Sequence, residues 1–224
     1  MAILYGQKIQ RGEKAGYVGT FLKQLKQIAS SCSEKNIKVV SNAGGLNPKS
    51  MAEEVKNILD SEGLNLKVAY IDGDDFMDKF DELKKNGEEL KNLDTGVSLF
   101  KQSLPAVSAN YYLGCWGIKQ ALDEGADIVI CPRVTDAALV MGPAAWKFNW
   151  SRDDYDKLAG SLAAGHIIEC VELKLRVATI LFLKKFHHFK MLDSQLQKLK
   201  NQAILKYTNT KGLVDWYQQV QLLL

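Results

Sequence analysis

Three residues in the first quarter of the chain have types that suit the binding of an anion. Asn42, Gly44 and Gly45 follow a short β-rich run and precede a helical pattern. Glycines at such a turn let the backbone approach a ligand closely, and free amides at a helix start favour negative charge. The segment has neither the G-x-G-x-x-G pattern nor the Lys-Ser/Thr pair of a phosphate-binding loop. A tight strand-to-helix turn is therefore an equally good interpretation.

A second candidate follows the most apolar strand-like run of the sequence. Arg133 and Asp136 lie in the loop that begins there. Arginine suits two-point recognition of a carboxylate or a phosphate. The alternative is an ion pair between Arg133 and Asp136 that closes the loop.

Three close carboxylates form a third candidate. Asp72, Asp74 and Asp75 could hold a divalent cation or a ribose hydroxyl, but such clusters are more often a solvated turn with a helix N-cap. We favour the solvated turn. The four cysteines lack the spacing of a metal finger, and we predict no metal site.

A histidine, a glutamate and a cysteine share the spacing i, i+3 and i+4 at His166, Glu169 and Cys170. On a helix this spacing puts all three on one face. They could form an acid/base pair, a thiol nucleophile or part of a metal site. The simpler interpretation is a histidine at a helix C-terminus, where the helix dipole favours it, beside a structural cysteine.

Strand-like and helical patterns alternate along the chain and must position these residues. The strand-like runs are Ile37–Ser41, Leu66–Ile71 and Asp127–Cys131. Helical spacing of apolar residues covers Tyr17–Lys35, Met51–Leu59, Phe76–Leu83, Tyr112–Glu124, Ala137–Trp146 and Asp153–Ala164. This alternation predicts an α/β fold, Rossmann-like, with a mainly parallel sheet that carries helices on both faces.

The parallel arrangement makes a prediction about the site. The three strand-like runs should be neighbouring parallel strands, and ligands bind beyond the carboxyl ends of such strands. We therefore expect a set of substrate-binding and catalytic candidates to converge at one edge of the sheet. The set is Asn42, Gly44, Gly45, Asn110, Arg133 and Asp136.

Charge is distributed unevenly along the chain. Up to Cys170 there are 20 Lys and Arg against 23 Asp and Glu, whereas the residues from Val171 onward have 9 against 3. The main body therefore gives no electrostatic reason to expect nucleic acid. We see no secretory signal and expect reduced thiols, which indicates the cytoplasm or an organelle matrix, without a membrane anchor.

Four sequence blocks together resemble the core domain of the acyclic terpene utilisation protein A (AtuA) family, from about Met1 to Cys170. They are Ser41-Asn42-Ala43-Gly44-Gly45-Leu46-Asn47-Pro48, then Ser108-Ala109-Asn110 with Tyr112-Leu113-Gly114, then Gly125-Ala126-Asp127-Ile128-Val129 with Arg133-Val134-Thr135-Asp136 and Gly142-Pro143, and finally Ala164-Gly165-His166 with Glu169-Cys170. The resemblance implies a place in the breakdown of acyclic terpenoids such as citronellol and geraniol, which proceeds through acyl-CoA thioesters. It implies no particular reaction. It favours a functional role for Arg133 and for His166.

The sequence departs from the family in three places. The family has a strand and a glycine-containing loop before the position of Met1, so we expect this chain to begin later than the family's core domain does. Cys131-Pro132 stands where the family has Thr-Gly or similar, and proline removes a backbone donor there. After Cys170 the family continues with a segment like Gly-Ala-Gln-Ala-Thr-Gly-Gly-Asn-Tyr, which this chain lacks.

A shifted reading frame explains the last departure. A back-translation of Val171–Ile180, with freely chosen wobble bases, encodes that missing segment when it is read from the third base. A back-translation of Lys206–Gln218 read at the same offset also gives a glycine-rich segment that resembles the family. We therefore divide the chain into an incomplete AtuA-like core, residues 1–170, and an out-of-frame tail, residues 171–224. The alternative is a native basic amphipathic tail in which Leu181–Leu183 contacts a membrane or a partner.

Three hypotheses follow for function. The first is an enzyme or enzyme subunit of acyclic terpenoid or branched acyl-CoA catabolism, which binds an acyl-CoA or another phosphate-bearing molecule. In it, Asn42, Gly44, Gly45, Asn110 and Arg133 bind substrate, and Asp136 and His166 are catalytic. The second is a non-catalytic accessory subunit that binds a partner, and the third is a truncated product without function. The sequence identifies no cofactor and leaves the oligomeric state open.

Overall fold

The structure is a computed structural model that describes residues 1–12, 14–101 and 106–166. The predictions made for Glu169, Cys170 and the tail from Val171 onward lie outside these residues. Within the described ranges, no helix combines the length and the apolar character that crossing a membrane requires.

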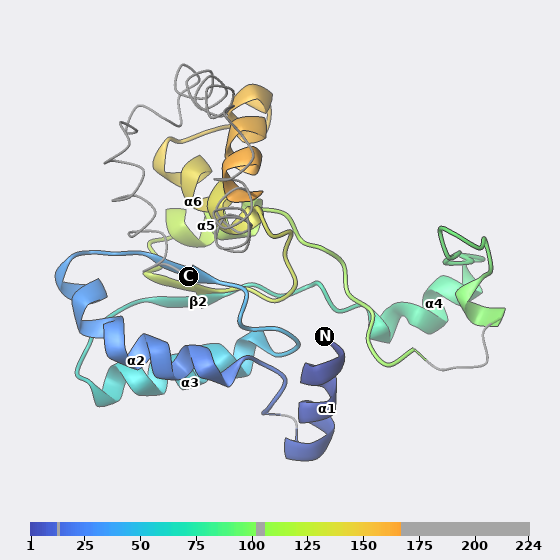
Figure 1. Ribbon diagram of the computed structural model, residues 1–224, viewed down its shortest axis with the longest axis horizontal. Helices are drawn as coiled ribbons and strands as arrows, with labels where there is room; N and C mark the ends of the chain where they lie inside the picture. The colour runs from blue at the N-terminus through green and yellow to red at the C-terminus, as the bar shows by residue number, and fades with distance from the viewer. Residues whose placement is uncertain (13, 102–105, 167–224) are drawn as a thin grey trace, which may run out of the picture.

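A sheet of three parallel strands lies at the centre of the fold (Figure 1). The strands are β1 (Val39–Ser41), β2 (Val68–Tyr70) and β3 (Ile128–Ile130), in the order β1-β3-β2. Strands β1 and β2 each pair in parallel with β3, so the prediction of neighbouring parallel strands is confirmed. The strand with the most apolar run takes the middle position, because only there are both faces and both edges covered.

Helices cover both faces of this sheet. Figure 1 shows α2 (Gly19–Glu34) and α3 (Pro48–Ser61) on one side, with α5 (Trp116–Asp123) and α6 (Ala138–Lys147) on the other. The buried side chains accordingly form two clusters, one between α2, α3 and the sheet and one between α5, α6 and the sheet. The predicted α/β class with helices on both faces is therefore confirmed.

Two helices differ from the sequence prediction. Helix α1 (Ala2–Arg11) was not predicted, and none of its residues is buried. Helix α5 begins at Trp116 rather than at Tyr112, because Leu113 forms a parallel bridge with Val134. The backbone before α5 is therefore extended and belongs to the strand-end region.

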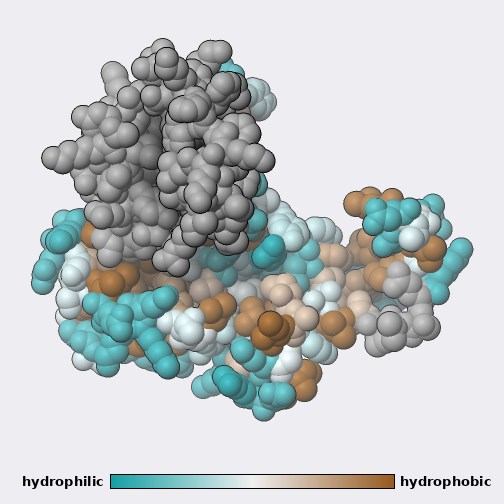
Figure 2. Space-filling model, viewed as in Figure 1, coloured by the Kyte–Doolittle hydropathy of each residue, from teal (hydrophilic) through white to brown (hydrophobic). Residues whose placement is uncertain are grey.

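The chain between β2 and α5 makes a long excursion, which we call the arm and define as the described residues of 76–109. It contains η1 (Met77–Lys79), α4 (Phe80–Lys85) and η2 (Leu99–Lys101), and it projects from the body (Figure 1). Phe80 stacks on Phe76 at 5.5 Å between ring centroids. Apolar and polar surface alternate over the arm (Figure 2). A small aromatic cluster thus replaces a hydrophobic core there.

Burial of Cys131 gives a first testable prediction. This cysteine follows β3 and is fully buried, and burial raises the pKa of its thiol to about 12. The thiolate is the reactive form, so at pH 8 Cys131 should have roughly a thousandfold less of it than an ordinary thiol. We expect iodoacetamide to alkylate Cys131 at least about 100-fold more slowly in the folded protein than in urea. Mass spectrometry of the Cys131 peptide measures both rates, and equal rates would show that β3 is not buried.

Candidate functional site

The loops that follow the three strands meet at one edge of the sheet. The backbone N–H of Gly44, after β1, donates to the carbonyl of Cys131 at 3.1 Å. The backbone N–H of Arg133, after β3, donates to the carboxylate of Asp74 at 3.3 Å. Since Asp74 follows β2, all three loops are joined by direct hydrogen bonds. The parallel topology requires this meeting, because parallel strands end on the same side.

A small cavity lies at this edge, and we call it the strand-end cavity. Its volume is about 200 Å³. That is below the size of pockets that enclose a drug-sized ligand, so it suits one end of a larger molecule. It is lined by Asn42, Gly45, Arg133, Pro132, Met1, Leu4 and Val18. The lining combines polar and charged groups, from Asn42 and Arg133, with apolar side chains at α1 and at the start of α2.

Arg133 is the positively charged side chain that lines the strand-end cavity. Its guanidinium lies 4.5 Å from the centroid of the Tyr112 ring, and Nη2 donates to the Tyr112 hydroxyl at 3.0 Å. Stacking orients the planar guanidinium and leaves the other N–H donors for a ligand. The alternative ion pair with Asp136 does not form within the described residues. Arg133 is thus pre-oriented by an aromatic ring rather than neutralised by a carboxylate.

Asp74 is a structural centre of the site that sequence analysis misjudged. We predicted a solvated acidic turn, and Asp72 and Asp75 are indeed exposed, with Asp75 capping the backbone N–H of Met77 at 2.9 Å. Asp74, however, is only 4% exposed. It accepts a hydrogen bond from Asn110 Nδ2 at 2.9 Å, in addition to the one from Arg133. Burial raises the pKa of Asp74, although these hydrogen bonds oppose the shift.

Asp74 therefore connects both ends of the arm to the loop after β3. Its backbone carbonyl also accepts from the N–H of Tyr111 at 2.7 Å, and Phe76 donates to the carbonyl of Ala109 at 3.0 Å. No sequence signal separates Asp74 from its two acidic neighbours, because burial there depends on the return of residues more than thirty positions later.

No group of three His, Cys, Asp or Glu side chains within the described residues could hold a metal ion.

The two glycines after β1 mainly allow neighbouring parts of the backbone to pack closely against the loop, rather than allowing contact with a ligand. A Cβ on Gly44 would lie 2.6 Å from the carbonyl oxygen of Cys131 and 2.8 Å from Cβ of Pro48. Gly45 has φ +56°, and a Cβ there would lie 2.8 Å from the carbonyl oxygen of Gly16. Gly44 is buried under β3 and α3, whereas Gly45 reaches the strand-end cavity. The interpretation as a tight turn therefore holds for both, and a ligand-facing position holds for Gly45.

The remaining predicted residues take different places. Asn110 binds Asp74 and does not line the strand-end cavity. Asp136 is exposed and also lies outside the cavity lining. His166 is exposed at the end of the described helical stretch 155–166. A Cβ on Gly165 would lie 2.9 Å from Cα of Ala137, so the helix end that carries His166 packs against the residue next to Asp136.

Comparison with known families gives one result for this chain. The family model described as acyclic terpene utilisation family protein AtuA matches residues 1–174. No curated protein and no solved structure matches the chain. The matched range includes every residue of the strand-end cavity, together with Asp74, Asn110, Asp136 and His166.

Proposed function

Because this chain belongs to the acyclic terpene utilisation family AtuA, we propose that it acts in the breakdown of acyclic terpenoids and binds a branched acyl-CoA at the strand-end cavity. Membership of the family supports the pathway, and the residues that line the cavity support the proposed chemistry of binding. The observation that carries the proposal is the orientation of Arg133, a cation that stacks on Tyr112 and lines a cavity with apolar side chains.

Charge and shape at the cavity suit an anionic group attached to a carbon chain. The guanidinium of Arg133 can bind a phosphate or a carboxylate through two parallel hydrogen bonds. Asn42 supplies an amide beside it, and Leu4 and Val18 supply apolar contact. The cavity of about 200 Å³ holds only one end of such a ligand, so the rest of a CoA ester would extend over the surface.

Asp136 and His166 are the candidates for proton transfer in this proposal. They come from different elements that the contact of Gly165 with Ala137 brings together. Both side chains are exposed and are therefore accessible to a substrate. A His166→Gln variant that binds ligand normally and loses turnover would assign His166 to the chemistry.

Replacement of Arg133 tests the binding proposal. We expect Arg133→Ala to weaken the binding of a branched acyl-CoA about 10- to 100-fold, since a charge-assisted hydrogen bond contributes about 1.5–3 kcal/mol. The affinity of Arg133→Lys should lie between those of wild type and Arg133→Ala, because lysine keeps the charge and loses the planar fork. Isothermal titration with branched acyl-CoA esters, free CoA and the free acids measures the dissociation constants and separates phosphate from carboxylate recognition.

Arg152→Ala is the matched control. Arg152 also stacks on an aromatic ring, that of Trp116 at 5.1 Å, but it does not line the strand-end cavity. Its loss should leave the dissociation constant within about twofold. Equal affinity of wild type and Arg133→Ala for every compound would refute the proposed site. Binding without turnover of any ester would favour the accessory-subunit hypothesis.

A further inference from the structure

The outer edge of β2 has unpaired backbone groups. In the ladder with β3, the carbonyl of Lys67 and the N–H of Ile71 face β3. Groups alternate along a strand, so the N–H and C=O of Val68 and Tyr70 face away from it. No strand pairs with that edge in the part of the chain that the structure describes. Such an edge is a template for a further strand.

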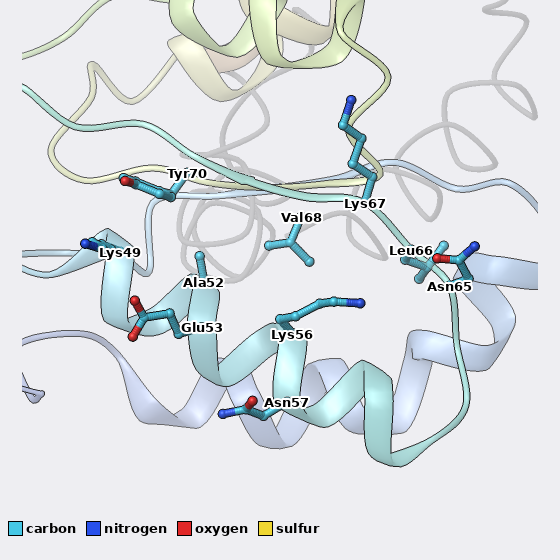
Figure 3. A pocket seen from close by; sticks show the side chains of 10 residues that line it. All are labelled: Lys49, Ala52, Glu53, Lys56, Asn57, Asn65, Leu66, Lys67, Val68 and Tyr70. Atoms are coloured by element: carbon cyan, nitrogen blue, oxygen red, sulfur yellow. The ribbon is translucent and has the colours of Figure 1, made fainter.

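The edge lacks the usual protection against pairing. Natural edge strands carry a proline, a bulge or an outward-pointing charge. Lys67 is the charged residue at the start of β2, but its Nζ donates to the carbonyl of Glu124, and Figure 3 shows it pointing away from α3. Tyr70 at the other end is 42% exposed. Neither a proline nor a free outward-pointing charge therefore protects the edge at β2.

A hollow of about 740 Å³ lies beside this edge, between β2 and α3 (Figure 3), and we call it the edge hollow. Its floor is apolar, with Ala52 and Val68 pointing toward one another and Leu66 beside them. A strand added to β2 would place alternate side chains into the hollow, as the next strand of a doubly wound sheet does. Of the side chains that an added strand points into the hollow, the middle one would therefore contact the apolar floor.

Two lysines of α3 flank that floor. Lys49 and Lys56 are exposed and line the edge hollow, with Glu53 between them. Lys49 forms no ion pair with any described residue, and the pair of Lys56 with Asp60 is solvent-exposed and contributes little. The two lysines lie seven residues apart on α3, about 10 Å along the helix axis. The hollow thus has two lysines along α3, with the carboxylate of Glu53 between them.

We propose that the edge hollow binds an extended acidic peptide segment of a partner protein, by addition of a strand to β2. On a strand, residues i and i+4 point to the same face about 13 Å apart, which the flexible lysine side chains can span. The recognised pattern is then carboxylate, apolar and carboxylate at positions i, i+2 and i+4. Backbone hydrogen bonds to Val68 and Tyr70 provide affinity, and Lys49 and Lys56 provide specificity.

The probe is a fluorescein-labelled Gly-Glu-Thr-Val-Thr-Glu-Gly peptide added to the full chain, with a Lys-for-Glu version as its counterpart. We expect saturable binding of the acidic peptide, at least tenfold tighter than that of the basic one, by fluorescence anisotropy. Hydrogen exchange at the amides of Val68 and Tyr70 should slow when the peptide binds. The double variant Lys49→Glu/Lys56→Glu should weaken binding at least tenfold, whereas Lys23→Glu on the exposed face of α2 should not.

A backbone variant separates strand addition from charge attraction. Tyr70→Pro removes an outward N–H without breaking the ladder to β3, which edge strands tolerate, and it should abolish binding. Tyr70→Thr keeps that N–H and should retain binding. Arg133→Ala, which tests the strand-end cavity, should leave peptide binding unchanged, so the two proposals fail separately.

Three results would overturn the inference. The first is no saturable binding, and the second is equal binding to the double lysine variant and to wild type. The third is a dimer in sedimentation velocity that Tyr70→Pro converts to monomer, which would assign the edge to a second copy of the chain.

Discussion

Replacing Gly44 with alanine should lower the free energy of unfolding by about 2–4 kcal/mol. The new Cβ would lie 2.6 Å from the carbonyl oxygen of Cys131 and within 2.9 Å of two atoms of Pro48. These neighbours are backbone and ring atoms, which cannot rotate away, so the loop after β1 must separate from β3 or from α3. Urea denaturation followed by circular dichroism measures the loss.

Gly19→Ala is the control for this substitution. Gly19 begins α2, and a Cβ there would meet nothing within 4 Å. Alanine also favours helix over glycine by about 1 kcal/mol, so the variant should be as stable as wild type or slightly more stable. If both variants have the stability of wild type, the close packing of β1, β3 and α3 at Gly44 is wrong.

Replacing Asp74 with alanine should cost about 2–4 kcal/mol, because it leaves the half-buried amide of Asn110 and the N–H of Arg133 without their acceptor. The arm should then detach at its base. Limited proteolysis should cut within residues 76–101 at least about tenfold faster than in wild type, if cleavage follows the population of the opened state. Asp74→Asn keeps an acceptor oxygen and should be the milder change.

The contribution of Asp74 to the free energy of unfolding changes with pH in a defined direction. Burial raises the pKa of Asp74 above its ordinary value of 3.8. The folded protein therefore holds this proton at pH values where the unfolded chain has released it. The stabilisation from this group is complete below pH 3.8 and is lost as pH rises through the raised pKa.

The variant Asp74→Asn lacks this titration. Its stability relative to wild type should therefore increase as pH rises from about 3.5 to 7, because only wild type must bury a negative charge. Urea denaturation of both proteins at a series of pH values measures the difference. A difference that shrinks with rising pH would mean that the hydrogen bonds from Asn110 and Arg133 outweigh burial, and that the pKa is lowered.

Local patterns were enough to predict the framework of this protein. Val39–Ser41, Val68–Tyr70 and Ile128–Ile130 are short apolar runs separated by helical periods, and a parallel sheet is the arrangement that buries such runs with helices between them. Topology then implies where the strands end, so the loops at Asn42 and Arg133 could be placed at one edge before any distance was known. Hydrophobic periodicity acts over a few residues, and the sequence displays it directly.

Tertiary structure alone decided which residues at that edge face a ligand and which hold the loops together. Asp74 cannot be distinguished from Asp72 by its neighbours in sequence, yet it is buried because Asn110 returns to it after the arm. Arg133 could equally have paired with Asp136, and the extended backbone before α5 brings Tyr112 to it instead. The open edge of β2 was likewise invisible, because strand order depends on pairings between distant segments, Val68 with Ile128 and Val39 with Ile128. Burial and pairing are set by such long-range contacts, and no short window of sequence contains both partners.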